Sequence, residues 1–184
     1  TIPINCSDTC NPASAVDVLG SIGNFALFTS FGAVGNTGTA GIDGDIGTDG
    51  GSISGYGSSI HFGSNYTADA ITAQAKVDLD IAYNALLAMT ITETHAAAFG
   101  SGETINPGIY DIGGAGSLSG TITLDGGGNS DAIFVLKFGG AFTVAAQSKV
   151  ILANGTRRCN VFWVGGAGVA TGAVSIGAFA IMKG

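Results

Sequence analysis

Aspartates are the most concentrated groups in the chain that could perform chemistry. Asp43, Asp45 and Asp49 lie close together in the stretch GIDGDIGTDGG. Asp43 and Asp45 would share one face of a strand, and paired carboxylates can act as general acid and base in hydrolysis or bind Ca²⁺. The calcium-binding Gly/Asp repeat recurs every nine residues, and this stretch does not. Turn-forming acids are the simpler interpretation, with calcium as the alternative.

Two further groups could bind a metal. Asp125, Asn129 and Asp131 could ligate calcium, but Asp and Asn are also common turn residues because their side chains bond the nearby backbone. His61 and His95 stand in separate segments, with no Cys or carboxylate at metal-ligand spacing, which favours structural histidines over ligands or bases. The sequence predicts no metal site, no cofactor and no catalytic residues, and hence a protein that is not an enzyme. It contains no phosphate-binding loop, dinucleotide fingerprint or nucleophile elbow.

The chain has three cysteines. Cys6 and Cys10 lie four residues apart, and we expect them to form a disulfide, with free thiols and a metal site as alternatives. Cys159 is expected to be a buried free thiol. The sequence starts at Thr1 rather than Met, as a processed exported protein would. These features together predict a secreted protein.

Charge argues against nucleic acid as a partner. The formal net charge is -7, and the few bases are scattered apart from Arg157 and Arg158, which we interpret as a charged turn. Only 10% of the residues are charged, whereas about a quarter is usual. Residues 161–182 carry no charge, but their glycines and few large aliphatic residues favour two strands over a membrane span.

Three segments differ in their patterns. Residues 18–63 contain short strand-like pieces separated by Gly and Asn. Residues 67–89 predict one amphipathic helix, with Thr67 as N-cap and Asp69 in the first turn. Its expected packing face comprises Ile71, Ala75, Leu79, Ala82, Leu86 and Met89. We interpret residues 94–108 as a linker.

Strand patterns return after this linker. Seven short apolar pieces between residues 108 and 182 alternate with small corner residues, as in GTITLDG. Short strands with tight corners suit a β-solenoid, in which coils stack and bury their inward side chains. A sandwich or jelly roll is the alternative. The single long helix favours the solenoid, because a stacked face offers a flat surface of matching length.

Long ordered stretches resemble the DUF3494 ice-binding protein family, a group of secreted proteins of cold-living microbes. They are residues 19–49, 100–144 and 160–184. The likeness covers residues 18–184 and leaves 1–17 as an N-terminal leader. It implies a mainly β fold, a right-handed, discontinuous, triangular parallel β-solenoid with one long helix along a face. It also implies an antifreeze function: adsorption to ice through a flat face that inhibits ice growth and recrystallisation.

The expected partner is thus the surface of an ice crystal, with no membrane partner. The face would carry outward Thr and Ser, since their methyl and hydroxyl groups can order water. The candidates alternate with inward apolar residues that include Val174 and Ile176, and they are Thr37, Thr39, Thr48, Ser52, Ser54, Ser58, Thr121, Thr123, Thr143, Thr171 and Ser175.

Two other functions remain open. The first is a structural or adhesive subunit of an extracellular fibre, because family members usually continue past the final MKG and an unfinished solenoid exposes strand edges. This predicts end-to-end homo-oligomers or filaments. The second is a carbohydrate-binding or carbohydrate-degrading solenoid, for which the chain lacks clustered acids and bases.

Overall fold

The computed structural model describes residues 18–36, 41–166 and 173–184. The described residues form two compact units, which we call the N-terminal unit (residues 18–85) and the C-terminal unit (residues 86–184). All strand pairs within both units are parallel.

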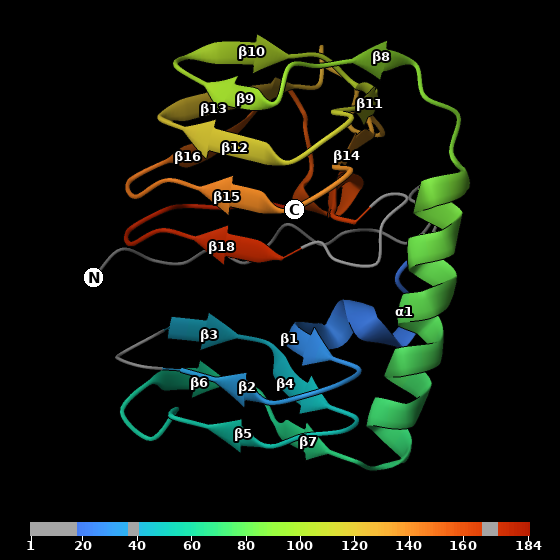
Figure 1. Cartoon of the computed structure of the whole chain (residues 1–184), viewed down its shortest axis with the longest axis vertical. Coiled ribbons are helices and arrows are strands. Elements are labelled where there is room, and N and C mark those ends of the chain that lie inside the picture. The colour runs from blue at the N-terminus through green and yellow to red at the C-terminus, as the bar shows by residue number, and fades with distance from the viewer. Residues whose placement is uncertain (1–17, 37–40, 167–172) are drawn as a thin grey trace. The chain divides into compact units, whose positions relative to one another are not determined.

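The C-terminal unit is a three-sided β-solenoid (Figure 1). Successive strands go to different sheets, and each strand pairs with its counterpart one coil away, so three parallel sheets enclose one core. The first sheet contains β8 (Glu93–Thr94), β11 (Gly108–Asp111), β14 (Phe134–Lys137) and β17 (Val161–Val164). The second contains β9 (Ala98–Gly100), β12 (Gly116–Ser119), β15 (Phe142–Val144) and β18 (Val174–Ile176). The third contains β10 (Glu103–Ile105), β13 (Thr121–Asp125) and β16 (Lys149–Ala153).

The N-terminal unit repeats this arrangement with fewer coils. Its main sheet contains β1 (Phe25–Thr29), β4 (Asp45–Thr48) and β7 (Asn65–Thr67), and a short 3₁₀ helix, Gly20–Asn24, precedes β1. Two-stranded sheets join β2 (Val34–Gly35) to β5 (Ile53–Ser54), and β3 (Gly41–Asp43) to β6 (Ile60–Phe62). The predicted β-solenoid with one helix is confirmed, and each predicted strand segment from residue 108 onward contains a strand.

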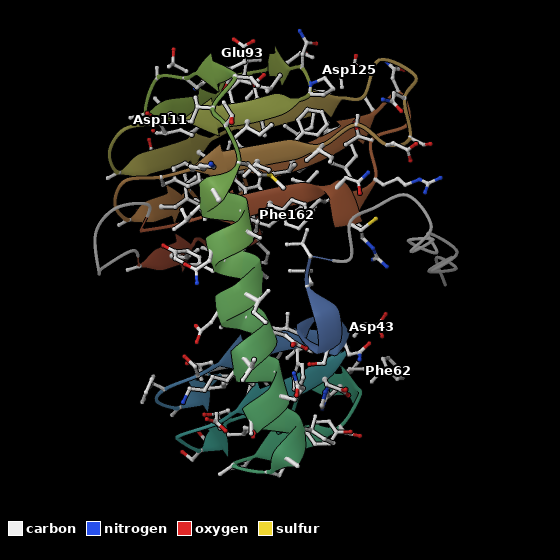
Figure 2. All side chains as sticks on the ribbon, turned by 90° about the vertical axis from the view of Figure 1, so that its right-hand side faces the viewer. Asp43, Phe62, Glu93, Asp111, Asp125 and Phe162 are labelled. Atoms are coloured by element: carbon white, nitrogen blue, oxygen red, sulfur yellow. The ribbon has the colours of Figure 1, made fainter. Side chains whose placement is uncertain are left out.

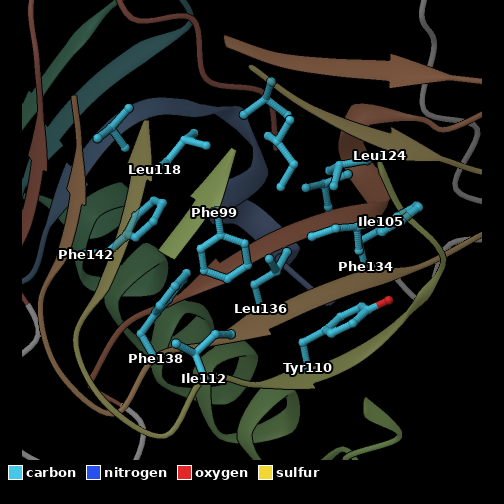
Figure 3. Close-up of a cluster of buried hydrophobic side chains, with 14 of the residues drawn as sticks. Phe99, Ile105, Tyr110, Ile112, Leu118, Leu124, Phe134, Leu136, Phe138 and Phe142 are labelled. Atoms are coloured by element: carbon cyan, nitrogen blue, oxygen red, sulfur yellow. The ribbon is translucent and has the colours of Figure 1, made fainter. Parts of the chain in front are cut away.

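Aromatic side chains fill the C-terminal solenoid (Figure 3). The rings of Phe138 and Phe142 stack at 4.3 Å between centroids, and Phe99 meets Phe138 edge-on at 5.8 Å. Gly116 makes this possible, because a Cβ atom there would lie 2.3 Å from the Phe138 ring. Dense aromatic packing over several coils gives the sheets outside it a rigid support.

Helix α1 spans Ala70–Ala88 and begins later than predicted. Thr67 lies in β7, and Asp69 is the residue that caps the helix: its Oδ1 accepts from the backbone N–H groups of Ile71 and Thr72 at 3.0 and 2.9 Å. The Thr72 hydroxyl in turn accepts from the Asp69 N–H at 2.9 Å, a reciprocal cap. Ala75, Ala82 and Leu86 are buried as predicted, whereas Ile71 is 46% exposed and Thr72 takes its buried place.

Asp78 on this helix binds the 3₁₀ helix of the N-terminal unit. Its Oδ2 accepts from the Ser21 hydroxyl at 2.5 Å and from the Ser21 backbone N–H at 2.8 Å, while Oδ1 accepts from Gln74. The Ser21 hydroxyl bond, followed by the Ser21 backbone bond and the Gln74 bond, lowers the pKa of Asp78 below its ordinary value.

This lowered pKa predicts a pH dependence. A carboxyl whose folded-state pKa is depressed contributes stability above its unfolded pKa, and that stability is lost as the pH falls through the folded pKa. We expect Asp78→Asn to lower the melting temperature at pH 7 and to have progressively less effect below about pH 4. Thermal unfolding followed by circular dichroism at both pH values measures this. An equal loss at both pH values would contradict the prediction.

Lys137 secures the C-terminal end of α1 within the C-terminal unit. This side chain is only 4% exposed, and its Nζ donates to the backbone carbonyls of Leu87 at 3.0 Å and Met89 at 2.6 Å. Burial lowers the pKa of Lys137, and the charge of Asp111 partly opposes that shift. A cation at a helix C-terminus bonds carbonyls that have no partner inside the helix.

Removing this cation should destabilise the C-terminal unit. We expect Lys137→Met to lower the free energy of unfolding by about 2 kcal/mol, because the two carbonyls lose their partner. The exposed Lys149 supplies the control, since Lys149→Met should change it by less than about 0.5 kcal/mol. Denaturant titration measures both variants, and equal effects would show that the Nζ bonds contribute no net stability.

Residues 94–108 are not a linker, because they contain β9 and β10 and the end of β8. No helix in the described part of the chain is long and apolar enough to cross a membrane.

Candidate functional site: a flat face of small residues

One side of the C-terminal unit is a flat surface of small residues. Strands β9, β12, β15 and β18 stack one below another in Figure 1. Their register aligns an outward central row of Ala98, Ser117, Thr143 and Ser175, all exposed. We call this row and its two flanking rows the small-residue face.

The flanking rows follow from the same register. Before the central row come Ala96, Ala115, Ala141 and Ala173; after it come Gly100, Ser119, Ala145 and Gly177. None of these residues is charged, and none is larger than threonine. Such a surface is level, because no side chain projects far beyond its neighbours.

Buried side chains hold the face from behind. Phe99, Leu118 and Val144, on the inner side of β9, β12 and β15, are 3, 0 and 2% exposed. In β18 the prediction fails, since Val174 and Ile176 are 60 and 57% exposed. Among the described residues β18 pairs with β15 alone, but β9 at the opposite edge also has one partner and still buries Phe99, so the edge position by itself does not explain the exposure of Val174 and Ile176.

The other two sides of the C-terminal unit are chemically different. On the third sheet, Thr121 pairs with Lys149 and Thr123 with Ile151, so long and charged side chains interrupt the threonines. On the first sheet, Val135 is fully buried and Lys137 nearly so. Within the described part of this unit, the small-residue face is the one flat side free of charge.

The structure separates the predicted ice-binding residues. Thr143 and Ser175 meet on the small-residue face, while Thr121 and Thr123 lie on the third sheet. Ser52 precedes β5 and Ser54 belongs to it, both exposed in the N-terminal unit, and the exposed Ser58 lies in a turn. Thr37, Thr39 and Thr171 lie outside the described residues.

Thr48 does not face outward as predicted. It is fully buried at the end of β4, and its Oγ1 donates to the Gly32 carbonyl at 2.7 Å. The hydroxyl satisfies a backbone acceptor of the neighbouring coil, so this threonine has a structural role.

Sequence reasoning missed Ala98 and Ser117 as members of the face. Alanine gives no polar signal, and Ala98 fell within the stretch interpreted as a linker. The coil spacing is also irregular: the central row has intervals of 19, 26 and 32 residues along the chain. The one available signal was the repeated pair of a small outward residue and an apolar inward residue. Aligning these pairs from strand to strand would have shown which small residues share the face.

The acids that suggested catalysis or calcium bond different neighbours and do not share a site. Asp49 pairs with Lys76 at 3.2 Å, Asp45 accepts from the Ser64 N–H at 2.8 Å, and Asp125 accepts from Asn154 at 2.8 Å. The labelled acids Glu93, Asp111 and Asp125 lie well apart in Figure 2. Among residues 18–36, 41–166 and 173–184, no three His, Cys, Asp or Glu side chains are grouped as a metal site.

Cys159 differs from its prediction. It is half-buried in a second 3₁₀ helix, Arg158–Asn160, and is disulfide-bonded rather than a free thiol. The other two cysteines, Cys6 and Cys10, lie outside the described residues. Because the chain has three cysteines, a bond from Cys159 to either of them and a Cys6–Cys10 bond exclude each other within one molecule.

Two solved structures that share this fold are ice-binding proteins. A crystal structure of an ice-binding protein from the Antarctic ascomycete Antarctomyces psychrotrophicus superposes with a TM-score of 0.77 at 26% identity, covering 90% of this chain and 96% of that one. One from an Antarctic Flavobacteriaceae bacterium gives a TM-score of 0.75 at 37% identity, covering 89% and 46% of the two chains.

Curated relatives agree with the structural neighbours. An ice-binding protein of a Nostoc species is 32% identical over 152 residues, which are 82% of this chain and 56% of that protein. Ice-binding protein 1 of Shewanella frigidimarina is 34% identical over 100 residues, covering 51% of this chain and 11% of that protein. The chain therefore spans about half, or less, of the length of these relatives. The family model described as Ice-binding-like matches residues 28–184, and the chain belongs to this ice-binding family.

Proposed function

We propose that the chain binds ice through the small-residue face. The observation that carries this proposal is the outward row Ala98, Ser117, Thr143 and Ser175, aligned on four stacked strands without a charged neighbour among its flanking rows. The related ice-binding proteins support the choice of ligand.

Physical chemistry explains why this surface suits ice. Charged side chains hydrate strongly and move, whereas methyl and hydroxyl groups on a fixed backbone can hold water in a regular arrangement. The face is supported by buried Phe99, Leu118 and Val144, so little conformational entropy is lost when it meets a crystal. Adsorption to the crystal would inhibit its growth and recrystallisation.

The N-terminal unit offers a smaller surface of the same kind. On β2 and β5, the exposed Gly35 lies beside Ser54, and Ala33 beside Ser52. We propose that these residues contribute to ice contact in a secondary way, because two short strands present less area than four.

Partition of the protein between ice and liquid is the direct test. A growing polycrystalline ice hemisphere should incorporate the chain and exclude a non-binding protein of similar mass mixed with it. The protein carries a fluorescent label on Lys149, which lies off the face, and we expect the ice hemisphere to become fluorescent. Exclusion of both proteins would refute ice binding.

We also propose that the protein acts outside the cell and has no catalytic activity. The disulfide at Cys159 fits an oxidising compartment. Among the described residues no three His, Cys, Asp or Glu side chains group as a metal site, and the family relatives are ice-binding proteins. The comparisons give no support to the fibre subunit or to the carbohydrate-active solenoid.

Self-association is a separate part of the proposal. Among the described residues β18 pairs on one side only, with β15, and Val174, Ile176 and Phe179 on or after it are 60, 57 and 85% exposed. An unpaired edge with exposed apolar residues favours pairing with a second copy. We expect sedimentation velocity to show dimers or longer assemblies as concentration rises, and Ile176→Lys to shift the distribution toward monomer. A monomer at all concentrations would contradict this expectation.

A further inference from the structure

His95 lies just before β9, the first strand of the small-residue face, with both ring nitrogens against oxygen atoms. Nδ1 lies 2.7 Å from the backbone carbonyl oxygen of Ala96, and Nε2 lies 3.2 Å from Oε2 of Glu103. A carbonyl oxygen and a carboxylate oxygen are both acceptors. Both ring nitrogens must therefore donate if both contacts are to be hydrogen bonds.

A neutral imidazole carries one N–H and can satisfy one of these acceptors, whereas the imidazolium carries two. The imidazolium facing a carboxylate at Glu103 can satisfy both contacts, whereas the neutral ring can satisfy one. The ring also stacks on Phe99, with centroids 4.3 Å apart and planes 4° from parallel. An aromatic face attracts a cation, so this stack favours the same charged form.

Glu103 connects this pair to the far end of β9. While its Oε2 faces His95, its Oε1 accepts the backbone N–H of Gly100, the last residue of the strand. The two side chains thus hold β9 at both ends, from the Ala96 carbonyl to the Gly100 amide. Within the described part of the chain β9 pairs with β12 alone, so these contacts take the place of a second neighbouring strand at this end of the face.

Other titratable groups near the ring are few among the described residues. Tyr110 of β11 presents its ring edge at 6.4 Å, and its hydroxyl donates to the Asn106 carbonyl. Asp111, also on β11, accepts from the Gly113 N–H, and Glu93 of β8 is exposed. On β14, Lys137 donates to the end of α1. Glu103 is the charged group that contacts His95 directly.

We propose that His95 and Glu103 form a pH-responsive clamp that sets the order of β9, and through it the flatness of one end of the small-residue face. Its effect on ice rests on the proposed function, whereas its effect on β9 does not. Deprotonation of His95 removes one of the two N–H donors, so Nε2 and the Glu103 carboxylate become two facing acceptors. The contact between His95 and Glu103 is then lost. The Glu103 side chain is no longer held in place, so its hydrogen bond from the Gly100 N–H weakens too.

The test follows the ring and the strand separately. In an ¹⁵N NMR titration, both ring nitrogens of His95 should be protonated at the acidic end. Loss of one ring proton should coincide with a loss of hydrogen-exchange protection at the Gly100 amide of about tenfold. Glu103→Gln is the informative variant: its amide can donate to a neutral ring and still accept from Gly100, so protection should persist after the ring titrates. His61 is the control histidine, because its Nε2 contacts a single acceptor, the Gly44 carbonyl at 2.9 Å, and His61→Gln should leave the response of Gly100 unchanged.

Thermal hysteresis measured over the same pH range completes the test. It should fall with the Gly100 protection in the unmodified protein and stay level in Glu103→Gln. A neutral His95 ring when Gly100 is most protected, or a titration that leaves Gly100 unchanged, would overturn the clamp. If the hydrogen-exchange protection of Gly100 changes with pH but thermal hysteresis does not, the proposed link between the clamp and the flatness of the face is wrong. A complete lack of hysteresis at every pH would instead count against ice binding, while the NMR titration would still decide the clamp.

Discussion

Thr143→Tyr should remove most of the thermal hysteresis. Thr143 is exposed in the central row of the small-residue face, between Ser117 and Ser175. A tyrosine ring there would project beyond the small neighbours on both sides and hold the rest of the face away from a planar crystal. Loss of contact over several rows explains why one substitution has a large effect.

The same substitution on another sheet shows whether the effect depends on the small-residue face or on the tyrosine itself. Thr104 is also an exposed threonine on a strand, but it belongs to β10 on the third sheet. Thr104→Tyr should leave hysteresis within experimental error, and both variants should change the free energy of unfolding by no more than about 0.5 kcal/mol. Equal hysteresis for Thr143→Tyr and the unmodified protein would show that ice is bound elsewhere.

Reduction of the disulfide at Cys159 should lower the free energy of unfolding by about 3 to 5 kcal/mol. With three cysteines in the chain, an intramolecular bond from Cys159 to Cys6 or Cys10 closes a loop of 154 or 150 of the 184 residues. Long loops restrict the unfolded chain most, so this bond should contribute strongly. Melting with and without reductant, compared with Cys159→Ser, measures the contribution.

Peptide mapping without reductant identifies the partner. A Cys159 peptide linked to one containing Cys6 or Cys10, with one thiol left to alkylate, is the expected result. A Cys6–Cys10 peptide with Cys159 free would contradict the bond at Cys159 and restore the pairing that sequence spacing predicts. Unchanged melting after reduction would show that the solenoid needs no covalent support.

Sequence patterns predicted the parts of the fold that depend on large side chains. The strand of Phe134–Lys137 and the alternation of Ile122 and Leu124 were visible, because apolar side chains must face a core. The helix was predicted for the same reason, although Asp69 rather than Thr67 caps it. Short strands, small corner residues and the single helix favoured a solenoid over a sandwich, and the family resemblance added its right-handed, triangular form.

The candidate face was less accessible to sequence reasoning. Ala98 and Ala115 are small and give no hydropathy signal, and which strands share a side depends on coil register. Thr48 shows the opposite error, since a threonine in an apparently exposed position is buried to bond Gly32. A short polar side chain can be buried or exposed, and the residues that surround it in the fold determine which.

The unequal coils have a practical consequence for protein engineering. Ala98, Ser117, Thr143 and Ser175 remain in register although the chain between them lengthens from 19 to 26 to 32 residues. The extra residues therefore leave at the corners, as in the Gly126–Gly128 turn after β13, without shifting the strands. A peptide tag or a reporter domain spliced into that corner should leave the face intact, so the protein can be immobilised or made visible on a crystal without redesign of the surface that touches it.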